Sequence, residues 1–317
     1  MKQKRDDIKP EQYSGILYYM PSPWRSYAEL MRLEKPIGWW LLLLPCWFST
    51  LLGGLYSQQT FLSIIDELVL FALGAIIMRG AGCVINDLAD RKFDGQVERT
   101  KNRPLPSGRV KPYQALIFFI ILLCIGLLIL LQFDRQTQII TTASLILVIA
   151  YPFAKRVTHW PQLILGLVFN WGVFAGWSAI VGADWYIALI LYLGCIAWTI
   201  GYDTIYAHQD KEDDIQIGVR STALLFGENT KKYICIFYAL FSFCIAASFY
   251  FALWHDLTQS YFRLIGVILT YILFVAHLSW QIRHIDISNS TQCLVLFKSN
   301  KQLGLILCLG LCLLYIM

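Results

Sequence analysis

The stretch NDLADRKFDGQVERTKNRPLPSG, residues 86–108, is a run of polar and charged residues between two strongly apolar segments. Within it Asn86, Asp90 and Asp94 recur every four residues, a spacing that places all three side chains on one face of a helix. Carboxylate and amide oxygens suit Mg2+, which keeps several waters and joins protein carboxylates to substrate phosphates. Basic residues follow closely behind. The stretch therefore predicts a site for a magnesium-bound polyphosphate.

The rest of the chain is unusually apolar. Of its 317 residues 57% are hydrophobic and 15% are charged, whereas a soluble domain carries about 25% charged residues. Apolar segments near the ~20 residues that cross a bilayer core recur along the whole length, and each must be a helix because lipid cannot satisfy its backbone. These segments lie at 37–55, 66–85, 113–132, 138–153, 161–181, 184–202, 232–254, 262–280 and 302–317. The pattern predicts an all-α polytopic membrane protein with nine transmembrane helices in a single bundle and excludes a soluble domain with one anchor.

The N-terminal residues, 1–24, mix acids with bases and contain no apolar signal-peptide core. A transit peptide would be rich in Arg and poor in acids, and this segment is neither. We therefore expect residues 1–31 to form a cytosolic tail and residues 32–317 to form the nine-helix domain.

The Lys and Arg residues predict the orientation. With the N-terminus inside, all of the 26 except Arg79, Arg135 and Arg263 fall in cytoplasmic segments or at their boundary. This is a strong positive-inside asymmetry. The acid-rich stretches after the second and sixth helices then share the cytoplasmic face, where the long polar segments also lie. We expect the protein to work on that face.

The second acid-rich stretch, YDTIYAHQDKEDDIQIGVRST at residues 202–222, places Asp203, Asp210 and Asp214 on one helical face. A single charge run is usually a solvated helix end. Two such runs on the same side of a membrane favour a diphosphate held by two Mg2+ ions. Asp87 and Asp90 also begin where an apolar helix is still running, and acids at membrane depth are usually functional.

A diphosphate also needs cations, and several polar residues near the two stretches are candidates for substrate binding. The candidates are Arg32, Lys35, Arg79, Arg99, Arg103, Tyr151, Lys155, Arg156 and Asn170. The alternative for the basic residues is that they set topology or bind anionic headgroups. Asn170, inside the fifth apolar segment, either contacts substrate or bonds to a neighbouring helix.

Three stretches carry a resemblance to a known family: RGAGCVINDLADRKFDGQVERTKNRPLPSG (79–108), YPFAKR (151–156) and YDTIYAHQDKEDDIQIGVRSTALLFG (202–227). They resemble the UbiA superfamily of intramembrane aromatic prenyltransferases. The first contains that family's N-D-x-x-D-x-x-x-D motif and the third its second Asp motif. The resemblance covers nearly the whole chain, from RLEKPIGWWLLLLP (32–45) to FKSNKQLG (297–304).

The resemblance implies a nine-helix bundle with a central cavity open to lipid. In such a bundle Asn86, Asp90 and Asp94 would face Asp210 and Asp214 across two Mg2+ ions. It further implies transfer of a polyprenyl group from polyprenyl diphosphate to position 3 of 4-hydroxybenzoate, in ubiquinone biosynthesis. Four acids are expected to be catalytic, and either Arg156 or Arg79 would hold the benzoate carboxylate. The expected catalytic residues are Asp87, Asp90, Asp203 and Asp210, with Asp87 or Asp203 removing the ring proton.

Two alternatives stay open. The acceptor is another aromatic, such as homogentisate, a naphthoate or a porphyrin, or the chain is a transporter that uses its acids for cation passage. A transporter predicts acids near the middle of the membrane, whereas most acids here lie at helix ends on one side. We expect the bacterial cytoplasmic (inner) membrane as the location, the bilayer and the two substrates as partners, no nucleic acid, and no obligate protein partner.

Overall fold

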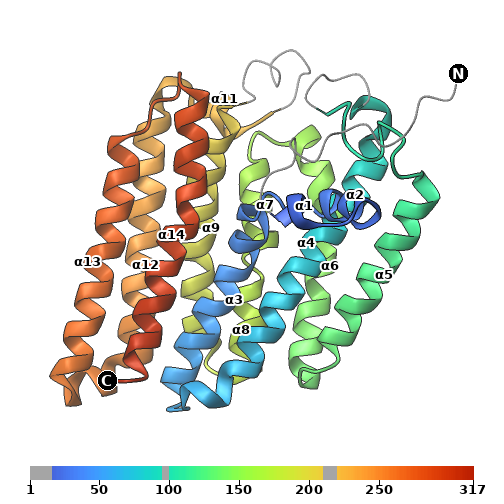
Figure 1. Ribbon diagram of the computed structural model, residues 1–317. Coiled ribbons are helices and arrows are strands. Elements are labelled where there is room, and N and C mark those ends of the chain that lie inside the picture. Colours follow the sequence, from blue (N-terminus) through green and yellow to red (C-terminus); the bar gives the residue numbers. More distant parts are fainter. Residues whose placement is uncertain (1–15, 95–99, 210–219) are drawn as a thin grey trace, which may run out of the picture. The chain divides into compact units, whose positions relative to one another are not determined.

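The computed structural model describes residues 16–94, 100–209 and 220–317 (Figure 1). Every regular element in these ranges is a helix, which confirms the predicted all-α class. The chain divides into two compact units, one formed by Met1–Trp40 and Ala72–Gln132 and the other by Leu41–Phe71 and Phe133–Met317. The predicted single domain of residues 32–317 stays a prediction.

The first unit contains α1 (Ile16–Tyr19), α2 (Ser22–Leu30), the start of α3 (Ile37–Tyr56), most of α4 (Ile65–Asp94) and α5 (Pro112–Leu130). In Figure 1 the short helices α1 and α2 run roughly at right angles to the long helix α4. Its core joins α2, α4, α5 and the segment between α4 and α5. The buried core residues are Leu30, Ala81, Val84, Leu105, Val110, Ala115 and Leu122.

Local sequence explains where α4 and α5 begin. Asp66 and Glu67 lie in the first turn of α4, where negative charge complements the helix dipole. Pro112 occupies the first turn of α5, where its missing N–H costs nothing, and the Gln114 side chain accepts from the Lys111 amide at 2.9 Å. Gly80 lets α4 pass close to Met31, because a Cβ there would lie 2.6 Å from the Met31 Cε.

The second unit holds the remaining helices. Besides the rest of α3 and the start of α4 these are η2 (Phe61–Ile64), α6 (Arg135–Val157), α7 (Pro161–Phe169), α8 (Gly172–Ile180), α9 (Trp185–Ala207), α11 (Thr222–Phe226), η3 (Gly227–Asn229), α12 (Thr230–Gln259), α13 (Tyr261–Arg283) and α14 (Ser290–Leu314). The central helix α9 packs along α7, α12 and α14, and α13 packs along α12 and α14. Trp198 stacks on Phe241 with ring centroids 5.3 Å apart, which anchors the α9–α12 contact.

Among the described residues eight helices are long and apolar enough to cross a membrane, one fewer than predicted. They are Ile37–Tyr56, Phe61–Arg91, Pro112–Leu130, Pro161–Ile180, Trp185–Ala207, Thr222–Trp254, Tyr261–Arg283 and Ser290–Leu314. The fourth predicted segment, 138–153, lies within the 23-residue helix α6, whose side chains at 150–157 are outside the described residues. The polytopic membrane fold is confirmed, and the count of nine is not.

Two helices extend well beyond the apolar segments predicted as membrane spans. The second apolar segment ends at residue 85, yet α4 continues to Asp94, and the ninth starts at residue 302, yet α14 begins at Ser290. In both cases the helix extends through polar residues, and among these the side chains of Asp87 and Asn300 have hydrogen-bond partners on other helices or segments. The fifth segment differs in another way: it is broken between α7 and α8, at Asn170 and Trp171.

Candidate functional site

The first acidic motif occupies the last turns of α4. This helix has 30 residues and is about 45 Å long, more than the ~30 Å of a bilayer core, so its last turns extend beyond the apolar segment. Asn86 and Asp90 are exposed and lie one turn apart. Asp94 is half-buried, and Asp87 is only 2% exposed. The motif therefore presents Asn86 and Asp90 outward and Asp87 inward.

Asp87 is held by two guanidinium groups. Arg32 donates from Nη2 to Asp87 Oδ1 at 2.6 Å, and Arg103 donates from Nη1 to the same oxygen at 3.4 Å. Arg103 Nη1 also donates to Asp94 Oδ2 at 2.9 Å. The other oxygen of Asp87, Oδ2, is buried without a hydrogen-bond partner among the described residues. We call Asp87, Asp94, Arg32 and Arg103 the Asp87 cluster; it combines two carboxylates with two cations and keeps unused acceptor capacity.

The backbone at Arg32 has a φ of +57°, in the left-handed region that non-glycine residues seldom adopt. Such a conformation costs of order 1 kcal/mol and persists where surrounding contacts require it. Here the contact is the ion pair with Asp87, because the side chain is directed to that carboxylate. Local strain at Arg32 is thus offset by a charge-assisted hydrogen bond.

The segment after α4 carries Arg103 and is folded on itself. Thr100 donates from Oγ1 to the Asp94 carbonyl at 2.8 Å, and the Arg103 amide donates to the Thr100 carbonyl at 2.9 Å. The Val110 amide donates to the Pro104 carbonyl at 2.9 Å, closing the loop. Its last turn uses Gly108, whose φ of +76° favours glycine. These bonds fix the position from which Arg103 reaches the acids.

The predicted cations near α3 have different surroundings. Arg79 is half-buried on α4 and lies against the start of α3, where a Cβ at Gly38 would be 2.7 Å from the Arg79 Nε. Lys35 is exposed. Between Arg32 and Lys35, Glu34 has a buried Oε2 without a hydrogen-bond partner among the described residues. Burial raises the pKa of Glu34 above its ordinary value of 4.5, although the neighbouring Lys35 and Arg32 act in the opposite direction.

In the second unit Asn170 connects two helices. Its Nδ2 donates to the Gly166 carbonyl at 2.8 Å, to the Cys195 carbonyl at 3.1 Å and to Thr199 Oγ1 at 2.8 Å. Asn170 is 1% exposed, and its Oδ1 has no hydrogen-bond partner among the described residues. Of the two interpretations of this residue, bonding to a neighbouring helix is confirmed. Contact with substrate stays a prediction.

Asp203 lies on α9 near its end and is half-buried. The described residues on either side of the second motif are fixed by buried hydrogen bonds. Thr204 Oγ1 lies 2.6 Å from Thr222 Oγ1, and the Thr222 amide donates to Gln162 Oε1 at 3.0 Å. His208 Nε2 lies 3.0 Å from Thr230 Oγ1. The described residues that precede and follow the second motif are therefore held in place by these hydrogen bonds.

Several predicted site residues lie outside what the structure describes. Arg99, Asp210 and Asp214 are in the segments 95–99 and 210–219. Tyr151, Lys155 and Arg156 belong to the last turns of α6, but their side chains are not among those described. The roles predicted for these six residues stay predictions.

The described part of the first motif fits a hard divalent cation. Asn86 and Asp90 offer exposed oxygen atoms one turn apart, and neither side chain has a hydrogen bond to another described residue. Such oxygens are the ligands that Mg2+ takes while keeping several waters. Across the described residues no group of three or more His, Cys, Asp or Glu side chains is close enough to enclose a metal by itself. The donor set fits a metal that is also bound by water and phosphate oxygens.

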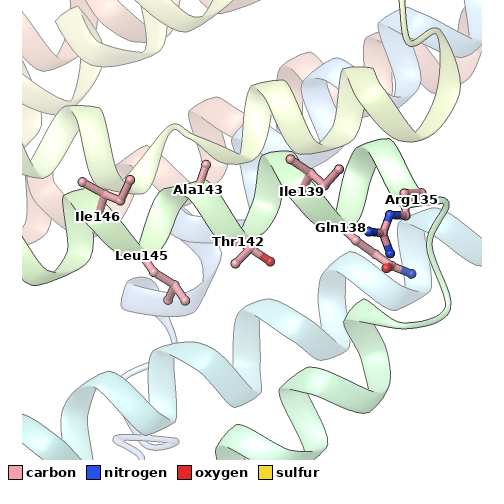
Figure 2. A pocket seen from close by; sticks show the side chains of 7 residues that line it. All are labelled: Arg135, Gln138, Ile139, Thr142, Ala143, Leu145 and Ile146. Carbon is pink, nitrogen blue, oxygen red and sulfur yellow. The ribbon is translucent and has the colours of Figure 1, made fainter.

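A separate hollow of about 570 Å3 lies along α6 (Figure 2). Its polar lining residues are Arg135, Gln138 and Thr142, and its other lining residues are apolar. Figure 2 shows Arg135 and Gln138 at one end of the row and Ile146 at the other. The lining contains none of the predicted site residues that the structure describes, so the hollow is distinct from the Asp87 cluster.

Comparison with protein families gives a match to the UbiA prenyltransferase family over residues 37–300, most of the chain. The chain belongs to the UbiA prenyltransferase family. Three relatives named 4-hydroxybenzoate polyprenyltransferase, mitochondrial, support this. The protein of Drosophila pseudoobscura pseudoobscura is 46% identical over 96% of this chain and 73% of its own length. That of Arabidopsis thaliana is 43% identical over 98% and 73%, and that of Homo sapiens is 44% identical over 94% and 77%.

Solved UbiA structures share the fold of this UbiA family chain at low identity. A UbiA homolog from Archaeoglobus fulgidus, described as bound to GPP and Mg2+, superposes with a TM-score of 0.66 at 18% identity and covers 92% of this chain and 100% of its own. The apo homolog from Aeropyrum pernix K1 has a TM-score of 0.64 at 22% identity and covers 86% of this chain and 96% of its own. At such identities the likeness shows the fold alone.

Sequence reasoning missed Glu29 and the extent of the N-terminal helices in this UbiA family chain. Residues 16–30, predicted to belong to a tail, form α1 and α2, and Leu30 is fully buried in the core of the first unit. Glu29 pairs with Arg109, 80 residues later. The available signal was the spacing of Tyr27, Leu30 and Met31, at positions i, i+3 and i+4, which marks a half-buried helix but identifies no partner.

Proposed function

We propose that this chain transfers a polyprenyl group from polyprenyl diphosphate to position 3 of 4-hydroxybenzoate, with release of diphosphate, as a step of ubiquinone biosynthesis. The main support for the proposal is the arrangement of side chains in the last turns of α4. There the exposed oxygens of Asn86 and Asp90 adjoin the Asp87 cluster, where Asp87 and Asp94 hold two guanidinium groups. The relatives' common name supplies the acceptor.

Two Mg2+ ions are part of the proposal. Asn86, Asp90 and Asp94 are assigned to ligate metal from the first motif, and Asp210 and Asp214 from the second. When bound, the metal would neutralise the charge that develops on the departing diphosphate. The support for the first set is its donor chemistry and exposure. The support for the second set is its spacing in the sequence.

The guanidinium groups of Arg32 and Arg103 would hold the diphosphate. Each Arg carries five N–H donors, more than the bonds to Asp87 and Asp94 use. Because the carboxylates fix these side chains before substrate arrives, little conformational entropy is lost when a phosphate oxygen accepts from them. Fixed cations beside the leaving group act on the charge that builds in the transition state. Lys35 and Arg99 are assigned to the same anion.

At the acceptor, the ring carbon ortho to the phenolic hydroxyl forms a bond to the allylic carbon as the carbon–oxygen bond to diphosphate breaks. The ring then loses the proton from that carbon. We assign its removal to a carboxylate, Asp87 through its unpartnered Oδ2 or Asp203. Arg79 or Arg156 would hold the benzoate carboxylate, and Tyr151, Lys155 and Asn170 would contact the substrates. Burial among helices would keep water from the allylic cation.

We place the enzyme in the bacterial cytoplasmic membrane, with the N-terminus and the site on the cytoplasmic side. The support is the distribution of Lys and Arg along the sequence. The relatives are mitochondrial by name, so the compartment needs its own test. A reporter that fluoresces only in the cytoplasm should be bright when fused after Gly108 and dark when fused after Gln259. The reverse pattern would refute the orientation.

The function is tested by incubating membranes that contain the chain with Mg2+, a polyprenyl diphosphate and 4-hydroxybenzoate. Mass spectrometry should detect the prenylated acid, and chelation of the metal should abolish it. Parallel reactions with homogentisate, a naphthoate or a porphyrin test the acceptor. Product with one of these acceptors alone would replace 4-hydroxybenzoate, and no product with any aromatic acceptor would refute the enzyme.

A further inference from the structure

Glu29 and Arg109 form a two-pronged ion pair outside the acidic motif. Arg109 donates from Nη1 to Glu29 Oε2 at 2.6 Å and from Nη2 to Glu29 Oε1 at 2.9 Å. The side chain of Arg109 is 12% exposed and that of Glu29 is 17% exposed, so solvent screens the pair little. Parallel guanidinium–carboxylate bonds are among the strongest and most directional contacts in proteins. The pair links α2 to the segment after α4.

Arg109 also makes hydrogen bonds that hold the segment after α4 together. Its Nη2 donates to the Asn102 carbonyl at 2.6 Å, and its Nε donates to Ser107 Oγ at 3.2 Å. Ser107 in turn donates from Oγ to the Arg103 carbonyl at 2.7 Å. One guanidinium therefore joins both sides of the turn that carries Arg103, and Glu29 fixes that guanidinium from outside.

Glu29, the partner of Arg109, lies on a rigid helix because α2 is packed into the core of the first unit. Leu30, next to Glu29, is fully buried with Val84 of α4 and Leu105 of the loop. The ring of Tyr27 meets that of Phe118 on α5 with centroids 4.9 Å apart. Glu29 thus projects from a fixed helix, and a flexible tail would not provide such a support.

We propose that Glu29 and Arg109 are positioning residues that hold the loop 100–110 so that Arg103 bridges Asp87 and Asp94 before the diphosphate binds. The proposal rests on the function proposed above, in which Arg103 binds that diphosphate. Together with Arg32, which pairs with Asp87, it makes the segment before α3 part of the site. The family match begins only at residue 37, so Glu29 precedes the matched region, whereas its partner Arg109 lies inside it.

The first test is hydrogen exchange of the purified protein without substrate or metal. Exchange is followed at four amides whose bonds close the loop, those of Arg103, Ser107, Gly108 and Val110. In Glu29→Gln these amides should exchange about tenfold faster, because the charge-assisted pair is lost. Glu228→Gln, the same change at an exposed residue of η3, should leave them unchanged. Unchanged exchange in Glu29→Gln would overturn the proposal.

The second test separates positioning from general stability. Glu29→Gln should raise the KM for polyprenyl diphosphate about tenfold, a modest cost for a misplaced binding group, while kcat changes less than about twofold. Arg109→Lys, which keeps the charge but loses the second prong, should raise the KM less than Arg109→Gln, which also loses the charge. A loss of kcat at unchanged KM, or an equal KM in Arg109→Gln and wild type, would overturn the positioning role.

The two tests fail in distinguishable ways. If wild-type protein forms no prenylated product, the proposed function fails, while the exchange measurement still decides whether Glu29 holds the loop. If product forms and Glu29→Gln behaves as wild type in both measurements, the function stands and the positioning role is refuted.

Discussion

Two buried polar clusters in this molecule have opposite character. The Asp87 cluster of the first unit is charged, and its Asp87 Oδ2 has no partner among the described residues. The second unit contains a neutral network around Gln281 and Asn300, both fully buried. Both clusters interrupt apolar helices with polar side chains, so sequence alone makes them look alike. Their hydrogen bonding separates them.

In the neutral network every donor and acceptor that the structure describes is used. Tyr238 donates to Gln281 Oε1 at 2.7 Å, and Gln281 Nε2 donates to Ser299 Oγ at 3.1 Å and to Asn300 Oδ1 at 3.3 Å. Trp198 donates from Nε1 to Asn300 Oδ1 at 2.7 Å. These bonds join α9, α12, α13 and α14 and satisfy one another, so the network has a packing role. In the Asp87 cluster, by contrast, Asp87 Oδ2 has no hydrogen-bond partner among the described residues and is available to a ligand.

The largest expected effect comes from the exposed metal-binding face. Asp90→Asn should lower turnover by about 10³-fold, because it removes a carboxylate from the proposed metal site and the loss of one electrostatic group commonly costs that much. The matched control is Asp66→Asn, the same change at an exposed residue of the first turn of the same helix. Product formation by equal amounts of inserted protein is measured by mass spectrometry. Wild-type turnover in Asp90→Asn would remove Asp90 from the metal site.

The next effect is expected at the centre of the charged cluster. Asp87→Asn leaves the guanidinium groups of Arg32 and Arg103 without their shared carboxylate, which for a buried pair costs about 3 kcal/mol of stability. It should also weaken binding of polyprenyl diphosphate, because both cations lose their fixed positions. Thermal unfolding in detergent and a binding titration measure the two losses. A loss of stability with unchanged binding would show that the Asp87 cluster stabilises the fold and has no role in binding the diphosphate.

A smaller effect is expected in the neutral network. Gln281→Leu removes bonds to Tyr238, Ser299 and Asn300 and should lower stability by about 1 kcal/mol, since interhelical hydrogen bonds in membranes average ~0.6 kcal/mol each and part is offset by apolar packing. The KM for polyprenyl diphosphate and the turnover per folded molecule should not change. A specific rise in KM would show that this network also serves the site.

The smallest effect concerns Glu34 and pH. Burial raises its pKa above 4.5, so its proton binds more tightly in the folded state than in the unfolded state. The resulting stabilisation is fully present below pH 4.5 and is lost as the pH rises through the higher folded-state pKa. Glu34→Gln should therefore have a flatter pH profile of stability and gain less than about 1 kcal/mol at pH 7. Melting temperatures between pH 4 and pH 8 test this, and an unchanged slope would contradict it.

The comparison also shows which features could be predicted from sequence. The four-residue spacing of Asn86, Asp90 and Asp94 sufficed to place them along α4, because a helix repeats locally. The inward turn of Asp87 depends on Arg32, 55 residues earlier, and the position of that side chain is set by packing between helices. Likewise, Asn300 lies in the polar first part of α14 and is paired with Gln281 and Trp198 of other helices. Long-range pairing leaves no periodic signal in one sequence.

The most direct test is whether the Asp87 cluster binds substrate while the neutral network around Gln281 only packs the helices. A binding titration with a polyprenyl diphosphate and Mg2+ is carried out in the same detergent on Asp87→Asn and Gln281→Leu proteins that remain folded. The account predicts that Asp87→Asn binds at least about tenfold more weakly than wild type, a loss of about 1.4 kcal/mol, while Gln281→Leu binds as wild type does. Equal weakening in both proteins, or wild-type affinity in Asp87→Asn, would contradict it.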